Sequence, residues 1–252
     1  LDLLTNELNI DRLKIASGEI LNGPLLLDHA ARAANLIVST GMCTLGDIEQ
    51  ALGVIAYGMC DSALPPCAES FKAVYCSDEG QQLLKEKVTL LHCTTEYPAP
   101  FNEINLNVLA SLKSSFELTV GYSDHTQGIV VPIAAVALGA KVIEKHFTLD
   151  RNMEGPDHSA SIEPSELKQM VAQIRKVEMA LGSSVKKPSP SELTNSSIAR
   201  KSLVAGEIIE VGELLTNQNL VIKRPGTGIS PMEFWNTLGT RATKRYNIDD
   251  LI

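Results

Sequence analysis

The sequence has few aromatic residues and no long apolar run. Only 4% of its 252 residues are Phe, Trp or Tyr. No stretch reaches the ~18 consecutive apolar residues that a membrane-spanning helix needs, and nothing after Leu1 is typical of a signal peptide. The sequence therefore excludes a membrane-spanning segment and gives no sign of export.

Positive charge is also scarce. The chain has 22 Lys and Arg against 30 Asp and Glu, a formal net charge of −8. A protein that binds nucleic acid usually carries a basic face, so this class is disfavoured. The net charge does not attract anions to the molecule as a whole, and any anion site has to be built locally.

The cysteines show neither an even count nor a metal-type spacing. There are five of them: Cys43, Cys60, Cys67, Cys76 and Cys93. We expect reduced thiols in a cytoplasmic protein. Two of them flank a Pro-Pro loop and could pair or hold a metal, but free thiols are the preferred interpretation.

Short apolar segments alternate with helix-like segments in the first part of the chain. We expect strands at 13–16, 36–39, 88–92, 117–122 and 141–145, and helices at 24–34, 45–57, 80–87, 129–139 and 164–181. This alternation predicts a parallel α/β sheet. No Gly-x-Gly-x-x-Gly turn follows a strand, which disfavours a dinucleotide site. Polar clusters at the carboxyl ends of the strands favour a (β/α) barrel of the TIM type.

The sequence divides into three parts. Residues 1–182 form the expected barrel domain, whose last helix ends at Gly182, a residue suited to a C-cap. Residues 183–198 are rich in Ser, Lys and Pro and predict a linker. Residues 199–252 form a second domain that is small enough to be marginal alone.

Two histidines follow neighbouring expected strands, His125 after 117–122 and His146 after 141–145. The carboxyl ends of parallel neighbours meet, and so would the two imidazoles. Two neutral imidazoles are a common start to a divalent metal site. A hydrogen-bonded pair of core histidines is the alternative. Asp124 and Glu144 could orient the imidazoles or cap the loops.

Six ordered motifs resemble the sialic acid synthases, the bacterial N-acetylneuraminate and legionaminate synthases. They read Lys-Ile-Ala-Ser-Gly-Glu at 14–19, Ser-Thr-Gly-Met at 39–42, His-Cys-Thr-Thr-Glu-Tyr-Pro at 92–98, Ser-Asp-His-Thr at 123–126, Glu-Lys-His-Phe-Thr at 144–148 and Gly-Pro-Asp-His at 155–158. Residues 202–228 resemble the small antifreeze-like (SAF) domain of that family. The resemblance covers essentially the whole chain.

The resemblance implies a reaction. That family condenses phosphoenolpyruvate with an N-acylated amino sugar, such as N-acetylmannosamine or 2,4-diacetamido-2,4,6-trideoxymannose, and releases phosphate. It uses a divalent metal, usually Mn²⁺, which can act as a Lewis acid. Its members are domain-swapped homodimers in which the SAF domain of one subunit caps the barrel of the other.

The resemblance also implies roles for single residues. His125 and His146 match the metal ligands, and Lys14 matches a lysine that contacts phosphoenolpyruvate. Ser17, Ser39, Ser123 and Thr95 match further positions near that ligand, although serines at strand ends also cap helices. Glu19 matches a glutamate that could shuttle a proton, Tyr97 and Asp157 match sugar-binding residues, and Arg224 matches an arginine inserted into the neighbouring subunit near the N-acyl group.

One departure separates the chain from the family pattern. An eight-stranded barrel needs roughly 250 residues, whereas residues 1–182 accommodate only five legible strands, which match strands 4–8. We expect a fragment or truncated relative that cannot turn over alone. Two alternatives stay open: a non-catalytic relative that binds sugar or dimerises, and a metal-dependent aldolase or hydrolase.

Overall fold

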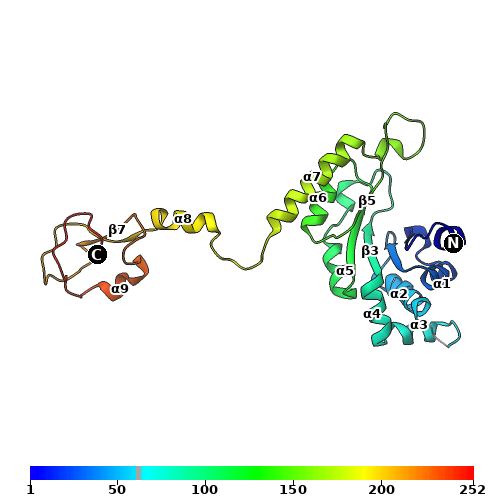
Figure 1. Cartoon of the computed structure of the whole chain (residues 1–252), viewed down its shortest axis with the longest axis horizontal. Helices are drawn as coiled ribbons and strands as arrows, with labels where there is room; N and C mark the ends of the chain where they lie inside the picture. The colour runs from blue at the N-terminus through cyan, green and yellow to red at the C-terminus, as the bar shows by residue number, and fades with distance from the viewer. Residues whose placement is uncertain (61–63) are drawn as a thin grey trace. The chain divides into compact units, whose positions relative to one another are not determined.

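The chain folds into two compact units. A computed structural model describes residues 1–60 and 64–252, and it divides into Leu1–Gly182 and Ser183–Ile252 (Figure 1). The loop between Cys60 and Cys67 therefore lies partly outside the described residues. All five cysteines carry free thiols within the described part, as expected.

Five strands and seven α-helices form the described part of the first unit. The strands are β1 (Arg12–Ile15), β2 (Asn35–Ser39), β3 (Val88–Cys93), β4 (Thr119–Asp124) and β5 (Ile143–Lys145). The helices are α1 (Gly23–Arg32), α2 (Leu45–Met59), α3 (Ala68–Tyr75), α4 (Asp78–Lys87), α5 (Val108–Phe116), α6 (Val130–Ala137) and α7 (Pro164–Leu181). Short 3₁₀ or π turns are η1 (Leu3–Glu7), η2 (Ser17–Glu19), η3 (Phe101–Glu103) and η4 (His158–Ala160). The five predicted strands are confirmed, whereas α3 and α5 were not predicted.

The five strands are parallel and pair in chain order, β1-β2-β3-β4-β5. Lys14 Nζ in β1 lies 3.4 Å from Glu144 Oε1 in β5. In a flat sheet, four strand spacings would separate β1 from β5 by about 19 Å, farther than the two side chains reach. The sheet is therefore curled, like part of the expected TIM-type barrel.

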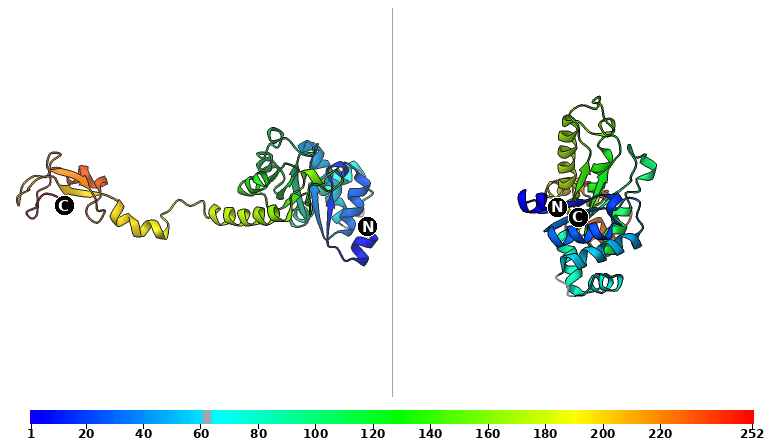
Figure 2. Two further views of the ribbon diagram at one scale, coloured as in Figure 1. Left: turned by 90° about the horizontal axis from the view of Figure 1, so that it is seen from above. Right: turned by 90° about the vertical axis from the view of Figure 1, so that its right-hand side faces the viewer.

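Apolar residues pack between the sheet and its outer helices. Leu90 of β3 is fully buried, as are Ile55 and other apolar residues of α2. Helix α2 begins at a capping box in which Thr44 N donates to Asp47 Oδ2 at 2.8 Å. It packs against α1 and α3, and α6 packs against α7 (Figures 1 and 2). Among the described residues, no helix is both long and apolar enough to span a membrane.

The second unit is smaller. It contains α8 (Pro190–Ala199), β6 (Ser202–Ala205), β7 (Leu220–Lys223), a 3₁₀ turn η5 (Pro231–Glu233) and α9 (Phe234–Thr237). Strands β6 and β7 are antiparallel. A small core, which includes Ile209, Leu215 and Tyr246, packs beneath them.

The prediction of a linker over 183–198 is wrong in part, because α8 begins at Pro190. Ser189 and Glu192 form a capping box: Glu192 N donates to Ser189 Oγ at 3.3 Å, and Ser189 N donates to Glu192 Oε2 at 2.7 Å. Proline at the first helical position fits the helix as well. The caps sustain a helix that buries none of its residues.

A substitution at Gly121 tests how closely the sheet is packed. A Cβ atom added there would lie 2.5 Å from both Leu91 Cδ2 and Val142 O. We expect Gly121→Ala to lower the free energy of unfolding by about 1–3 kcal/mol, because overpacking forces neighbours apart. Urea denaturation followed by circular dichroism measures this change. Gly46→Ala is the control, since a Cβ atom added there would lie 3.8 Å from Thr44 Oγ1, an ordinary contact. An equal loss in both variants would contradict the prediction.

Candidate active site

Side chains at the carboxyl ends of β4 and β5 alternate between the two faces of the sheet. Ser123 pairs in register with Glu144, and Asp124 with Lys145. Because side chains alternate along a strand, Ser123 and Glu144 share one face, where Ser123 Oγ donates to Glu144 Oε1 at 2.7 Å. His125 returns to this face, with its Nε2 3.5 Å from Ser123 Oγ.

The two histidines of the predicted metal pair lie side by side. The ring centroids of His125 and His146 are 5.4 Å apart, and the rings are nearly perpendicular. Tyr97 completes the group, with its ring centroid 4.2 Å from that of His125 and 5.3 Å from that of His146. Parallel pairing of β4 with β5 therefore brings the imidazoles together, as the sequence predicted.

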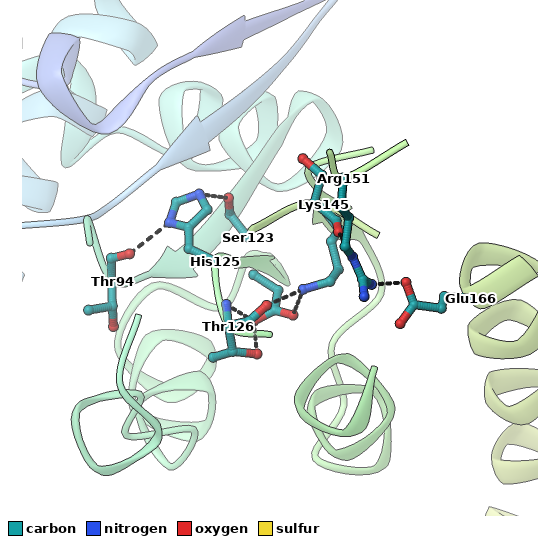
Figure 3. A network of polar contacts seen from close by, with 9 residues as sticks. Thr94, Ser123, His125, Thr126, Lys145, Arg151 and Glu166 are labelled. Carbon is teal, nitrogen blue, oxygen red and sulfur yellow. Dashed lines mark hydrogen bonds and ion pairs between the residues drawn. The ribbon is translucent and has the colours of Figure 1, made fainter. Parts of the chain in front are cut away.

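A backbone carbonyl fixes the tautomer of His125. Its Nδ1 lies 2.7 Å from Thr94 O (Figure 3). A carbonyl oxygen only accepts, so Nδ1 carries the hydrogen and Nε2 keeps its lone pair. Burial lowers the pKa of the imidazole, and the nearby His146 acts in the same direction. His125 is therefore neutral near pH 7 and presents Nε2 as a potential metal ligand.

The histidine pair fits an open metal site rather than a closed one. His146 is one-third exposed, at 33%, and its Nδ1 lies 4.0 Å from Asp157 Oδ2. Within the described ranges, no three His, Cys, Asp or Glu side chains gather as a complete metal-binding set. Structural zinc sites have four protein ligands, whereas catalytic sites leave positions for water or substrate. Two imidazoles with free positions suit a catalytic divalent ion.

Asp124 and Glu144 do not orient the imidazoles through hydrogen bonds. Asp124 Oδ2 instead accepts from Lys145 Nζ at 2.6 Å, and its Oδ1 accepts from Thr126 N at 3.0 Å. Glu144 accepts from Ser123 and pairs with Lys14. Asp124 therefore caps the loop after β4. The group that bonds directly to the His125 ring at Nδ1 is the Thr94 carbonyl.

Lys14 belongs to the same group although it comes from the first strand. Its side chain is 32% exposed and crosses the concave face to reach Glu144. Ser123, which bonds to the same carboxylate oxygen, lies beside His125. The predicted phosphoenolpyruvate lysine and the predicted metal pair thus lie at one connected polar site.

A second polar cluster surrounds Gly41, after β2. A Cβ atom added to Gly41 would lie 2.3 Å from Thr95 Oγ1 and 2.7 Å from Ser17 Oγ. Gly41 N donates to Ser17 Oγ at 3.1 Å. Nearby in sequence, Ser39 Oγ is buried and lacks a hydrogen-bond partner among the described residues. Buried hydroxyls are normally paired, so these residues are suited to a polar ligand.

Three other predicted residues lie outside this connected group. Glu19 is exposed on η2, where its Oε2 accepts from Asn22 Nδ2 at 2.8 Å. Asp157 is exposed and touches the group only through the 4.0 Å approach to His146. Arg224 belongs to the second unit, where its Nε donates to Ala199 O at 3.2 Å.

Two further groups at this site were not predicted from the sequence. Lys145, which stands between Glu144 and His146 in the sequence, has a side chain that is only 3% exposed, and its charge within a strand was the available signal. Thr94 acts through its carbonyl oxygen, which every residue carries, so no side-chain pattern could identify it.

Comparisons with known proteins agree with these motifs. The profile of the NeuB family matches residues 1–186. The N,N'-diacetyllegionaminic acid synthase of Campylobacter jejuni is 51% identical over 99% of this chain and 68% of its own length. The Legionella pneumophila synthase of the same name is 42% identical over 93% of this chain and 60% of its own length.

A solved structure agrees as well. The N-acetylneuraminic acid (sialic acid) synthetase of Leptospira borgpetersenii, in complex with citrate, has a TM-score of 0.60 and 34% identity over 75% of this chain and 57% of that chain. The chain spans 60% to 68% of the length of the two curated relatives. These matches establish that the chain belongs to the NeuB family of sialic acid synthases, whose relatives named above are enzymes.

Proposed function

We propose that this chain carries the metal-binding and phosphoenolpyruvate-binding part of a synthase that forms a carbon–carbon bond. The second substrate is an N-acylated amino sugar, and the product is a sialic-acid-type nonulosonic acid. The carrying observation is the connected group of Lys14, Glu144, Ser123 and His125 on one face of the sheet. The 51% identical relative, named as a diacetyllegionaminic acid synthase, favours 2,4-diacetamido-2,4,6-trideoxymannose over N-acetylmannosamine.

In the proposed reaction, C3 of phosphoenolpyruvate forms a bond to the aldehyde carbon of the open-chain sugar. The aldehyde oxygen takes up a proton, and the C2–O bond to phosphate breaks as the oxygen of a water molecule adds to C2. Lys14 would hold the anionic substrate through charge-assisted hydrogen bonds. Ser17, Ser39, Thr95 and Ser123 would add hydroxyl groups, and Glu19 would supply the proton.

His125 and His146 would hold the divalent ion, which we propose to be Mn²⁺. When bound, such an ion acts as a Lewis acid toward the sugar aldehyde. The lowered pKa of His125 and the hydrogen bond that leaves its Nε2 unprotonated support this role. Tyr97, against both rings, and Asp157, beside His146, would contact the sugar next to the ion.

We further propose that the second unit is an SAF domain and that the protein acts as a domain-swapped homodimer. Arg224 is exposed on the segment that follows β7. An arginine in that position can donate one or two hydrogen bonds to the oxygen of an acyl carbonyl. In the proposed dimer it reaches the N-acyl group of the substrate in the other subunit.

Metal binding tests the proposed function directly. We expect the chain to bind Mn²⁺ and His125→Ala and His146→Ala each to weaken that binding at least about tenfold, or 1.4 kcal/mol. Electron paramagnetic resonance of free Mn²⁺ measures the dissociation constant. His29→Ala is the control, because this histidine lies on α1 and bonds to Leu25 O. Equal affinity in all four proteins would contradict the assignment of the metal ligands.

A substitution at Gly41 tests whether the polar cluster around it binds phosphoenolpyruvate. We expect Gly41→Ala to weaken phosphoenolpyruvate binding at least about tenfold, since the new methyl group would displace Thr95 and Ser17. Calorimetry without metal measures the affinity, and thermal unfolding checks the fold. Gly46→Ala provides a matched control in α2. Wild-type affinity in a folded Gly41→Ala protein would remove this cluster from the binding site.

A further inference from the structure

An ion pair lies buried on the face of β4 and β5 opposite the imidazoles. The side chain of Asp124 is 0% exposed and that of Lys145 is 3% exposed, with Lys145 Nζ 2.6 Å from Asp124 Oδ2. Taking both charges out of water offsets much of their attraction, so an apolar pair of similar size often stabilises a fold equally well. Stability alone therefore does not account for this pair.

The Asp124–Lys145 pair is connected to both histidines because its two residues are their neighbours in the chain. Lys145 directly precedes His146, while its ammonium binds both residues that flank His125: Asp124 through Oδ2 and Thr126 through its carbonyl oxygen, each at 2.6 Å (Figure 3). Asp124 Oδ1 also accepts from Thr126 N at 3.0 Å and from Thr126 Oγ1 at 2.8 Å. The segment that carries His125 is thus folded around one carboxylate.

We propose that Asp124 and Lys145 are positioning residues that set the spacing and direction of the two imidazoles. This inference rests on the proposed metal site. Strand β5 has only three residues, which pair with Tyr122, Ser123 and Asp124. A ladder this short leaves the end of β5 weakly held. The ammonium adds two hydrogen bonds at that end, so the backbone segments that carry His125 and His146 are tied to each other.

A role limited to stability makes a different prediction, and the chain offers a second ion pair for comparison. Lys85 and Glu117 also form an ion pair at 2.6 Å, but their side chains are 40% and 70% exposed, and they join the end of α4 to the segment before β4. Removal of that pair leaves the residues on either side of the histidines untouched.

The experiment compares three variants with the unaltered chain: Asp124→Asn/Lys145→Met, Thr126→Val, and the control Lys85→Met/Glu117→Gln. Mn²⁺ affinity is measured by electron paramagnetic resonance, phosphoenolpyruvate affinity by calorimetry without metal, and folding by thermal unfolding. We expect the first variant to weaken Mn²⁺ binding about 10- to 100-fold and to keep phosphoenolpyruvate affinity within about twofold. Thr126→Val, which removes one bond to Asp124, shifts Mn²⁺ affinity less but in the same direction, and the control leaves it unchanged.

Two results would overturn the inference while the proposed function stands. One is unchanged Mn²⁺ affinity in a folded double variant, and the other is an equal loss of Mn²⁺ and phosphoenolpyruvate binding, which indicates a general structural role. If the double variant does not fold, Thr126→Val decides, and unchanged Mn²⁺ affinity there overturns the inference. Absence of Mn²⁺ binding by the unaltered chain would instead overturn the proposed metal site and this inference together.

Discussion

The curl of the parallel sheet is the constraint on which the candidate site depends. Pairing of the strands in chain order places all five carboxyl ends at one edge. That alone would leave Lys14 and Glu144 on opposite sides of a flat sheet, about 19 Å apart. Because the sheet curls, the carboxyl ends of β1 and β5 approach each other. The curl therefore allows the 3.4 Å contact between Lys14 and Glu144. The proposed phosphoenolpyruvate lysine thereby meets the proposed metal pair.

Strand alternation then gives the two faces of β4 and β5 different tasks. Ser123 and His125 face the polar group on the concave side, whereas Asp124 and Thr126 bond to Lys145 on the other side. A one-residue shift in register would exchange these sets. The same register therefore determines both which groups can meet a ligand and which groups hold the backbone beneath them.

The sequence predicted the strands and the histidine pair because both depend on local apolar runs and on the general rule that parallel strands share a carboxyl edge. Helix α5 escaped prediction because no glycine marks its C-terminal end. The helix ends at Phe116, and the C-cap that follows is Glu117, which adopts a left-handed φ of 54° that glycine usually supplies. For α8 the capping box was present, but a Ser- and Pro-rich composition obscured it. The bond from His125 to the Thr94 carbonyl depends on tertiary structure alone.

The two lysine–carboxylate pairs at the site differ in a way that matches their positions. Lys14 and Glu144 are 32% and 40% exposed and 3.4 Å apart, so water screens their attraction. An arriving phosphate, with more charge and more acceptor oxygens than one carboxylate, can replace Glu144 as the partner of Lys14. The side chains of Asp124 and Lys145 are buried and 2.6 Å apart, and loss of either partner would leave the other charge buried and unpaired. The face proposed to bind ligands therefore carries an exposed ion pair, and the face proposed to position the imidazoles carries a buried one.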